Sequence, residues 1–215
     1  MFTRAKYFLV PFFWLLLAAG GVSANPLNGT WQLDAAAAET LEEAAAAMNA
    51  HLKEEYRRYK EQKFAKDEQV STRGNRFLAQ QRATAMMIRE NDFDIDWGGP
   101  PEVRGMLSAT TIKLYQDSKA VILYDGTRRR LLAINPAGRA YSVKGTELTK
   151  DDIGRSLTFV EDGALVVETD VYNGDKMIER FESSAGSDLL TLTIRLQEGR
   201  RSPWLEYERV FKRVE

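Results

Sequence analysis

The sequence predicts a mainly β protein, α+β by content, whose antiparallel strands form an up-and-down meander that closes into a barrel. Two observations predict this fold. From Thr110 onward, short runs of β-branched, leucine and aromatic residues recur between Asp-Gly, Asn-Gly and similar turns. Before them, residues 35–66 are rich in Ala, Glu, Lys and Leu and contain no Gly or Pro, which predicts one long helix.

The first 24 residues have the three parts of a secretory signal peptide. Arg4 and Lys6 precede an apolar run over 7–22, and a small-residue cleavage site, Val22-Ser23-Ala24, follows. A spanning helix needs ~20 apolar residues, and this run is shorter and is interrupted by Pro11. We therefore predict cleavage after Ala24 and no membrane span in the mature form.

Composition limits the class of partner and the compartment. The whole chain has 30 Lys and Arg against 31 Asp and Glu, and the mature chain is nearly balanced as well, which argues against nucleic acid as a partner. The absence of cysteine excludes disulfides, thiolate chemistry and a lipid-anchored lipoprotein. An exported domain without disulfides must be held by its core, so we expect a single domain, residues 25–215, in the periplasm of a Gram-negative bacterium.

The N-terminal half of the mature chain is predicted to be a strand followed by a helical insertion. Residues 25–34 should form the first strand, with Leu27, Trp31 and Leu33 on one face. The insertion covers 35–100, with a long helix over 35–66 and a shorter one near 77–90.

The long helix has a candidate start and a narrow apolar stripe. Thr40 and Glu43 have the spacing of a capping box, although Asp34 is an alternative N-cap. Apolar residues recur at steps of three and four, which is more often a core-packing pattern than a partner-binding one. The stripe consists of Leu41, Ala45, Met48, Leu52, Tyr56 and Tyr59.

The C-terminal half, 110–215, is predicted to be an antiparallel meander. Its strands are expected at 111–116, 119–124, 128–134, 139–144, 155–161, 164–172, 175–183, 188–197 and 204–214. Alternation is clear at 190–197, where leucine and isoleucine face one way and polar residues the other. Ten strands exceed what a flat sheet accommodates easily, and closure removes the edges, so we expect a barrel or a strongly curved sheet.

Three fragments support a resemblance to a known family. Gly29-Thr30-Trp31 on a first strand, with Arg209 and Arg213 on the last, resembles the lipocalin and calycin pattern. Together with 163–169 and 207–213, it is similar to uncharacterised lipocalin-like proteins exported by Gram-negative bacteria. The resemblance implies that the tryptophan plugs the barrel base and that a late arginine packs over the indole.

The sequence departs from this family pattern in one respect. The side chains that carry the resemblance also have alternative explanations. About 75 helix-rich residues follow the first strand, where the family continues its meander. Trp31 is equally well explained as an ordinary core aromatic. Arg209 and Arg213 are alternatively part of a solvated strand edge, and for Arg213 we favour this explanation.

The expected function is non-enzymatic binding of a small apolar or amphiphilic molecule inside the barrel. One alternative is an envelope interaction protein that uses the helix over 35–66 as its docking surface, and another is a hydrolase or isomerase of unknown type. Alternation selects the expected ligand-lining residues, which are Trp31, Leu192, Ile194, Leu205 and Tyr207.

Charged motifs give one candidate site and two weak ones. Arg128, Arg130 and Arg201 could form an anion-binding rim, because guanidinium groups bind phosphate and carboxylate in a bidentate manner. The run of aspartates over 92–96 imitates the start of a calcium loop but lacks the later ligands, and His51 has no partner at useful spacing. We predict no catalytic residue, no metal and no cofactor.

Overall fold

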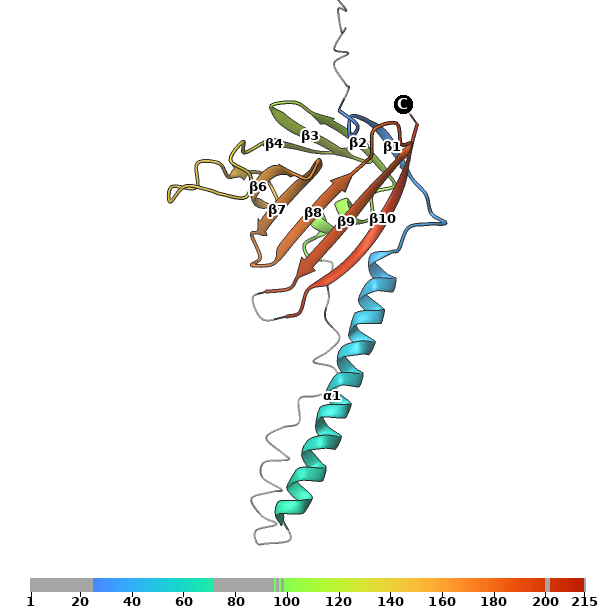
Figure 1. Cartoon of the computed structure of the whole chain (residues 1–215), viewed down its shortest axis with the longest axis vertical. Coiled ribbons are helices and arrows are strands. Elements are labelled where there is room, and N and C mark those ends of the chain that lie inside the picture. Colours follow the sequence, from blue (N-terminus) through green and yellow to red (C-terminus); the bar gives the residue numbers. More distant parts are fainter. Residues whose placement is uncertain (1–24, 72–94, 96, 98, 200–201, 215) are drawn as a thin grey trace, which may run out of the picture.

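A computed structural model describes residues 25–71, 95, 97, 99–199 and 202–214, and of residues 63–71 only the backbone. Ten antiparallel strands form one sheet in the order β4-β3-β2-β1-β10-β9-β8-β7-β6-β5 (Figure 1). The strands are β1 (Gly29–Leu33), β2 (Thr111–Gln116), β3 (Lys119–Tyr124), β4 (Arg128–Ala133), β5 (Thr149–Lys150), β6 (Gly154–Glu161), β7 (Ala164–Val171), β8 (Lys176–Glu182), β9 (Leu189–Gln197) and β10 (Leu205–Arg213). The predicted meander is confirmed.

The sheet curves until its two ends almost meet. An isolated bridge joins Ile134, just after β4, to Thr158 on β6, and the Asn135 amide donates to the Thr158 carbonyl (2.7 Å). The Ala133 amide donates to the Thr149 hydroxyl (2.9 Å). The barrel is therefore nearly closed along the line between β4 and β5–β6, which leaves few free strand edges.

The prediction of a strand at 139–144 is wrong. This segment forms turns and extended loop, and the only pairing nearby is the two-residue β5. Tyr141 is 66% exposed and Val143 is fully exposed, so the alternating residues have no core to face. The Asn135 side chain instead organises a local turn, accepting from the Ala137 amide (3.2 Å).

Helix α1 (Leu41–Ser71) begins later than predicted, and the capping box explains where. The Glu43 carboxylate accepts from the Thr40 amide (3.0 Å), and the Thr40 hydroxyl accepts from the Glu43 amide (3.2 Å). The preceding residues do not join the helix because their main chain bonds elsewhere: the Glu39 amide donates to the Glu208 carbonyl on β10 (3.1 Å). The helix predicted near 77–90 lies outside the described residues.

Only the first turns of α1 pack on the barrel, and the rest of the helix extends away from it (Figure 1). Leu41, Ala45 and Met48 lie against the core, so this part of the stripe is a packing surface. Further along, Tyr59 is 53% exposed. Docking through the helix beyond Met48 stays a prediction. Within the described chain, no helix combines the length and the apolar character needed to cross a bilayer.

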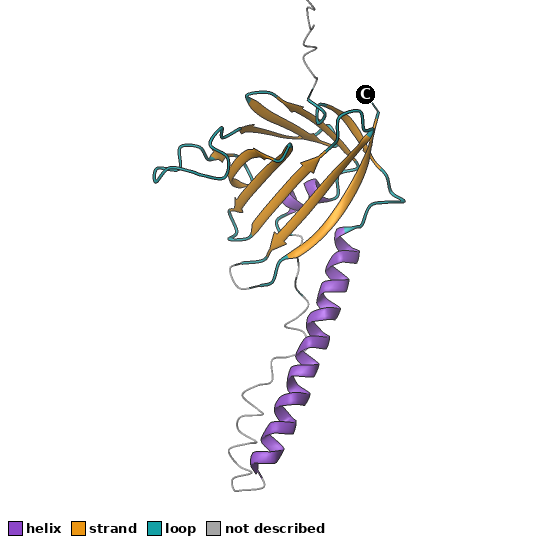
Figure 2. Cartoon of the chain, viewed as in Figure 1, coloured by secondary structure: helices purple, strands orange, loops and turns teal. Residues whose placement is uncertain are grey.

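A short helix that the sequence analysis did not predict plugs one end of the barrel. Helix α3 (Pro101–Leu107) begins just after the helical insertion predicted over 35–100, and proline is well suited to its first turn. Val103, Met106 and Leu107 are buried in the barrel core. Figure 2 shows this helix within the curve of the strands.

Trp31 and Arg213 form a stacked pair at the other end. The indole is fully buried and donates to the Leu27 carbonyl (3.0 Å), while the Arg213 guanidinium lies 4.0 Å from the ring centroid. Arg213 also donates to the Asn28 and Pro26 carbonyls (2.6 Å each). The expectation of a solvated edge for Arg213 is therefore wrong, because its guanidinium is used to hold the N-terminal segment over the core.

Candidate functional site

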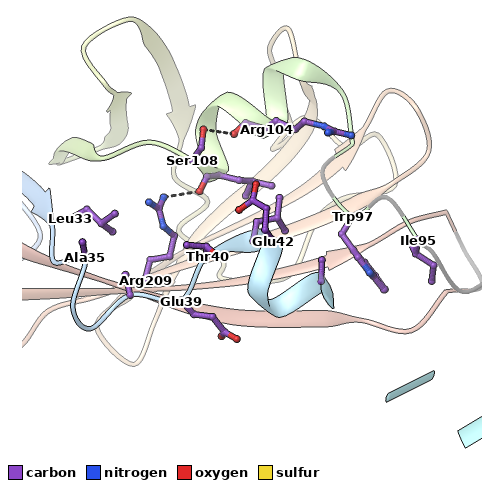
Figure 3. Close-up of a pocket in the computed structure, with 14 residues that line it drawn as sticks. Leu33, Ala35, Glu39, Thr40, Glu42, Ile95, Trp97, Arg104, Ser108 and Arg209 are labelled. Atoms are coloured by element: carbon purple, nitrogen blue, oxygen red, sulfur yellow. Dashed lines mark hydrogen bonds between the residues drawn. The ribbon is translucent and has the colours of Figure 1, made fainter. Parts of the chain in front are cut away.

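A cavity of about 410 Å³ lies at the α3 end of the barrel. Such a volume is within the range, about 300–1,000 Å³, of small-molecule sites. Its walls come from the end of β1, the start of α1, the segment around Trp97, α3 and β10 (Figure 3). The apolar lining residues are Leu33, Ala35, Ala38, Leu41, Ala45, Ile95, Trp97 and Leu107.

Arg209 is the charged side chain at the inner wall of this cavity. It follows Leu205 and Tyr207 in the inward-facing alternation of β10, and only 4% of its surface is exposed. Its Nη1 donates to the Leu107 carbonyl (2.7 Å), as Figure 3 shows. Among the described residues, no carboxylate lies within 4.0 Å of it, so its charge has no direct counter-ion there.

The electrostatic surroundings of Arg209 are those of a cation removed from water. Burial lowers the pKa of the guanidinium, and the more distant Tyr207, Asp125 and Glu42 partly offset this. Arginine stays charged even so, because its ordinary pKa lies far above neutral pH. The Phe211 ring, 5.2 Å away, adds a weak cation–π contact.

Polar contacts fix the wall opposite β10. The Trp97 indole donates to the Asn49 side chain (3.2 Å), and that amide donates to the Ile95 carbonyl (3.3 Å). The Ser108 hydroxyl donates to the Arg104 carbonyl (2.9 Å) at the end of α3. These bonds fix Trp97 and the end of α3, which line the cavity, and give each of these polar groups a partner.

Two carboxylates, Glu39 and Glu42, line the outer rim of the cavity and are exposed to solvent. Water and salt screen exposed charges far more strongly than buried ones. The inner end of the cavity therefore carries a buried cation, and its solvated rim carries Glu39, Glu42 and the exposed Arg104.

The five residues predicted to line a ligand are all buried, but none of them lines this cavity. Trp31, Leu192, Ile194, Leu205 and Tyr207 belong to the packed core, together with α3, which occupies the space that an open barrel would leave. Burial raises the pKa of the Tyr207 hydroxyl, which has no hydrogen-bond partner within the described part of the chain. A ligand role for these five residues stays a prediction.

The arginines predicted to form an anion-binding rim are not brought together. Arg128 lies 3.8 Å from Asp152, and Arg201 is outside the described residues. Arg130 is fully buried inside the barrel, where its Nη1 donates to Glu179 and its Nε to Asp151 (2.8 Å each). Because both carboxylates already pair with it, Arg130 is not available to a ligand.

Arg130 is the centre of a polar network that crosses the barrel. Its Nη2 donates to the Ser156 hydroxyl (2.6 Å), and the Tyr124 hydroxyl donates to the second Glu179 oxygen (2.6 Å). Burial alone would lower the pKa of the Arg130 guanidinium, but Glu179 and Asp151 raise it. The network joins β3, β4, β6 and β8 around the line of closure, and its burial leaves no access for a substrate.

Catalytic and metal chemistry find little support in the described residues. His51 is exposed on α1, with its Nε2 3.4 Å from Glu55. No group of three or more His, Cys, Asp or Glu side chains converges within the described ranges. The three aspartates of the calcium-like run over 92–96 lie outside those ranges.

A second cavity, of about 140 Å³, lies over the outward side chains of β6–β9. Its three arginines already have carboxylate partners. Arg139 pairs with Glu168 (2.9 Å), Arg180 with Glu161 (3.1 Å) and Arg195 with Glu206 (3.1 Å). The contrast with Arg209, which has no such partner, makes the cavity at the α3 end the better candidate site.

Comparisons with known proteins do not assign this chain to a family. No family model matches the sequence, and no curated protein matches it. Among solved structures, it is similar to secretory abundant heat soluble protein 4 from Ramazzottius varieornatus, with a TM-score of 0.41 and 9% identity over 90% of this chain and 98% of that chain. This similarity is too low to bear on function, so the site rests on its own geometry.

Proposed function

We propose that this protein is a non-enzymatic binding protein for a small amphiphile with an anionic head group. The observation that carries the proposal is Arg209, a buried cation without a carboxylate partner in the described chain, at the inner wall of a largely apolar cavity. The site differs from the barrel interior that the sequence suggested, because α3 fills that interior.

The chemistry of the cavity matches the two ends of such a ligand. A buried charge is costly unless it is paired, so a carboxylate or phosphate beside Arg209 would relieve a penalty that the free protein bears. A guanidinium also offers several N–H donors in a planar fork that fits these anions, and only Nη1 is engaged by Leu107. Leu33, Leu41 and Trp97 would contact the apolar chain of the ligand.

The charges around the cavity favour one orientation of the ligand. Arg209 attracts an anionic head group at the inner wall, where burial strengthens the interaction. At the solvated mouth, Glu39 and Glu42 repel this head group and the exposed Arg104 attracts it only weakly, because water and salt screen its charge. The ligand would therefore bind with its anionic end inward. An amphiphile with a cationic head would be excluded from the inner wall for the same reason.

Titration with three ligands that each carry a chain of about ten carbons tests the proposal. Decanoate, decanol and decyltrimethylammonium share a chain and differ in head-group charge, and isothermal titration calorimetry measures each affinity. We expect decanoate to bind most tightly. Arg209→Met should weaken decanoate by about tenfold to a hundredfold, the value of one charge-assisted contact, and bring it close to decanol.

Arg155→Met is the matched control, since Arg155 is an exposed arginine on β6, remote in the chain from the cavity residues. It should leave all three affinities unchanged. Equal binding of the three ligands, or equal loss of decanoate binding in both variants, would contradict the proposal. Circular dichroism of Arg209→Met distinguishes a lost contact from a lost fold.

Export and family are part of the same proposal. The stacked Trp31 and Arg213 fit the lipocalin-like resemblance, in which a late arginine packs over the first-strand indole. A protein cleaved after Ala24 and released into the periplasm as the single domain 25–215 would meet amphiphiles in transit across the envelope. The Gram-negative source rests on the sequence alone.

A further inference from the structure

The outward side chains of β2, β3 and β4 form a second surface, which we name the basic face. Alternation buries Ile112, Ile122 and Leu132 in the barrel and turns their neighbours outward. The basic face consists of Lys113, Tyr115, Lys119, Val121, Leu123, Arg129 and Leu131.

The strand register arranges these side chains in two rows. Tyr115, Val121 and Leu131 are cross-strand partners and form an apolar row. Lys113, Leu123 and Arg129 form the adjacent row, in which cations flank a leucine. Tyr115 is 49% exposed and Leu131 is 45% exposed, so the apolar row is presented to solvent.

The cations of the basic face have no counter-ions in the described chain. Lys113, Lys119 and Arg129 make no ion pair within 4.0 Å there, and Lys113 instead lies 5.8 Å from the Tyr115 ring centroid. The outward cations near the other strands are mostly paired: Arg139, Lys176, Arg180, Arg195 and Lys212 each lie close to a carboxylate.

Two acidic residues, Asp117 and Asp125, lie in the turns of the basic face. The Asp125 carboxylate is already hydrogen-bonded to the backbone, because its Oδ1 accepts from the Thr110 and Thr111 amides (2.8 and 2.7 Å). Asp117 lies in the β2–β3 turn. The face therefore combines unpaired positive charge with an exposed tyrosine and leucine, although the chain as a whole is nearly neutral.

We propose that the basic face docks the protein onto an anionic lipid bilayer. Lysine and arginine near such a surface are attracted to its negative potential, and tyrosine is favoured at the headgroup level, where its ring is apolar and its hydroxyl is polar. Leu131 and Val121 would bury shallowly between the headgroups. The positive charge of the basic face complements an anionic bilayer, and it favours this partner over a neutral protein surface.

This inference stands apart from the proposed function, because no residue of the basic face lines the Arg209 cavity. A binding protein that rests on a bilayer would be close to a source of amphiphiles, but either property can hold without the other.

Vesicle co-sedimentation tests the docking. The exported protein, with its mass checked for loss of residues 1–24, is mixed with vesicles of phosphatidylcholine alone or mixed with phosphatidylglycerol. We expect binding to the anionic vesicles only, weakened by added salt. Replacing both Lys113 and Arg129 with glutamine should weaken it by about tenfold or more. Replacing both Tyr115 and Leu131 with serine should weaken it as well.

The control removes the same net charge elsewhere, by replacing Lys150 and Arg155 with glutamine. These exposed cations are register partners on β5 and β6 and make no ion pair among the described residues. The control should bind vesicles like the parent. The inference is overturned by absence of binding to anionic vesicles, by equal binding to both vesicle types, by an equal loss in the control, or by binding to a soluble polyanion such as heparin alone.

Discussion

Replacing Arg130 with methionine is expected to lower the free energy of unfolding by about 3–5 kcal/mol. The substitution leaves Glu179 and Asp151 without their cation, and Glu179 is fully buried. Removing one partner of a buried pair costs more than the pair itself contributes, because the remaining charge is desolvated and uncompensated. Urea denaturation followed by circular dichroism measures the change.

The loss in this variant should depend on pH with a definite sign. Burial already raises the pKa of the Glu179 carboxyl, against the opposing effect of Arg130, and without Arg130 this pKa rises further. The folded state then binds more protons than the unfolded state, so stability falls as pH rises from the ordinary glutamate pKa, about 4.3, through the folded-state value. The deficit should therefore be smaller at about pH 4.5 than at pH 7.

Three variants make this result interpretable. Arg155→Met removes an exposed arginine and should change stability by less than about 0.5 kcal/mol. Combining Arg130→Met with Glu179→Met should recover part of the loss, since both partners become apolar. If Arg130→Met does not fold, Arg130→Lys keeps a charge and should lose less. A cost for Arg130→Met no larger than that of the control would contradict the role assigned to the network.

Trp31→Ala is expected to cost about 3–5 kcal/mol. The indole is fully buried, packs under the Arg213 guanidinium and donates to the Leu27 carbonyl. Its removal opens a cavity and releases the arginine that holds the N-terminal segment through two carbonyls. Thermal and urea unfolding give the change in stability.

Two other tryptophan variants give the comparison. Trp31→Phe keeps a ring under the guanidinium and loses the indole donor, so the expected cost is smaller, about 1–3 kcal/mol. Trp204→Ala removes a half-buried tryptophan that stacks on Arg195 and should cost least. Equal costs for Trp31→Ala and Trp204→Ala would show that the stacked pair does not hold this end of the barrel.

Most of the β half could be predicted from the sequence because its turns have strong local preferences. Asp162-Gly163 joins β6 to β7 with both residues at positive φ, 52° and 83°, as a tight primed turn requires. The strand at 139–144 shows the limit of this reasoning. Alternation indicates a strand only when one face has a core to pack against, and Val143 faces solvent.

The site could not be predicted because it depends on contacts distant in the chain. Arg209 and Leu107 are 102 residues apart, and only the packing of α3 against β10 gives the arginine its buried partner. Arg130 resembled a rim residue because its carboxylates lie 21 and 49 residues away. The alternation of β10 places Arg209 on the same face as Leu205 and Tyr207. A cation on a face that is otherwise buried is the one signal in the sequence that could have indicated this site.

Native mass spectrometry of the protein, purified gently and recorded before and after organic extraction, tests the central claim most directly. We expect an extractable adduct with an anionic head group on the parent protein, reduced in Arg209→Met and retained in Arg155→Met. A bare mass for the parent protein, or an adduct that survives unchanged in Arg209→Met, would contradict the assignment of this cavity as a binding site for an anionic amphiphile.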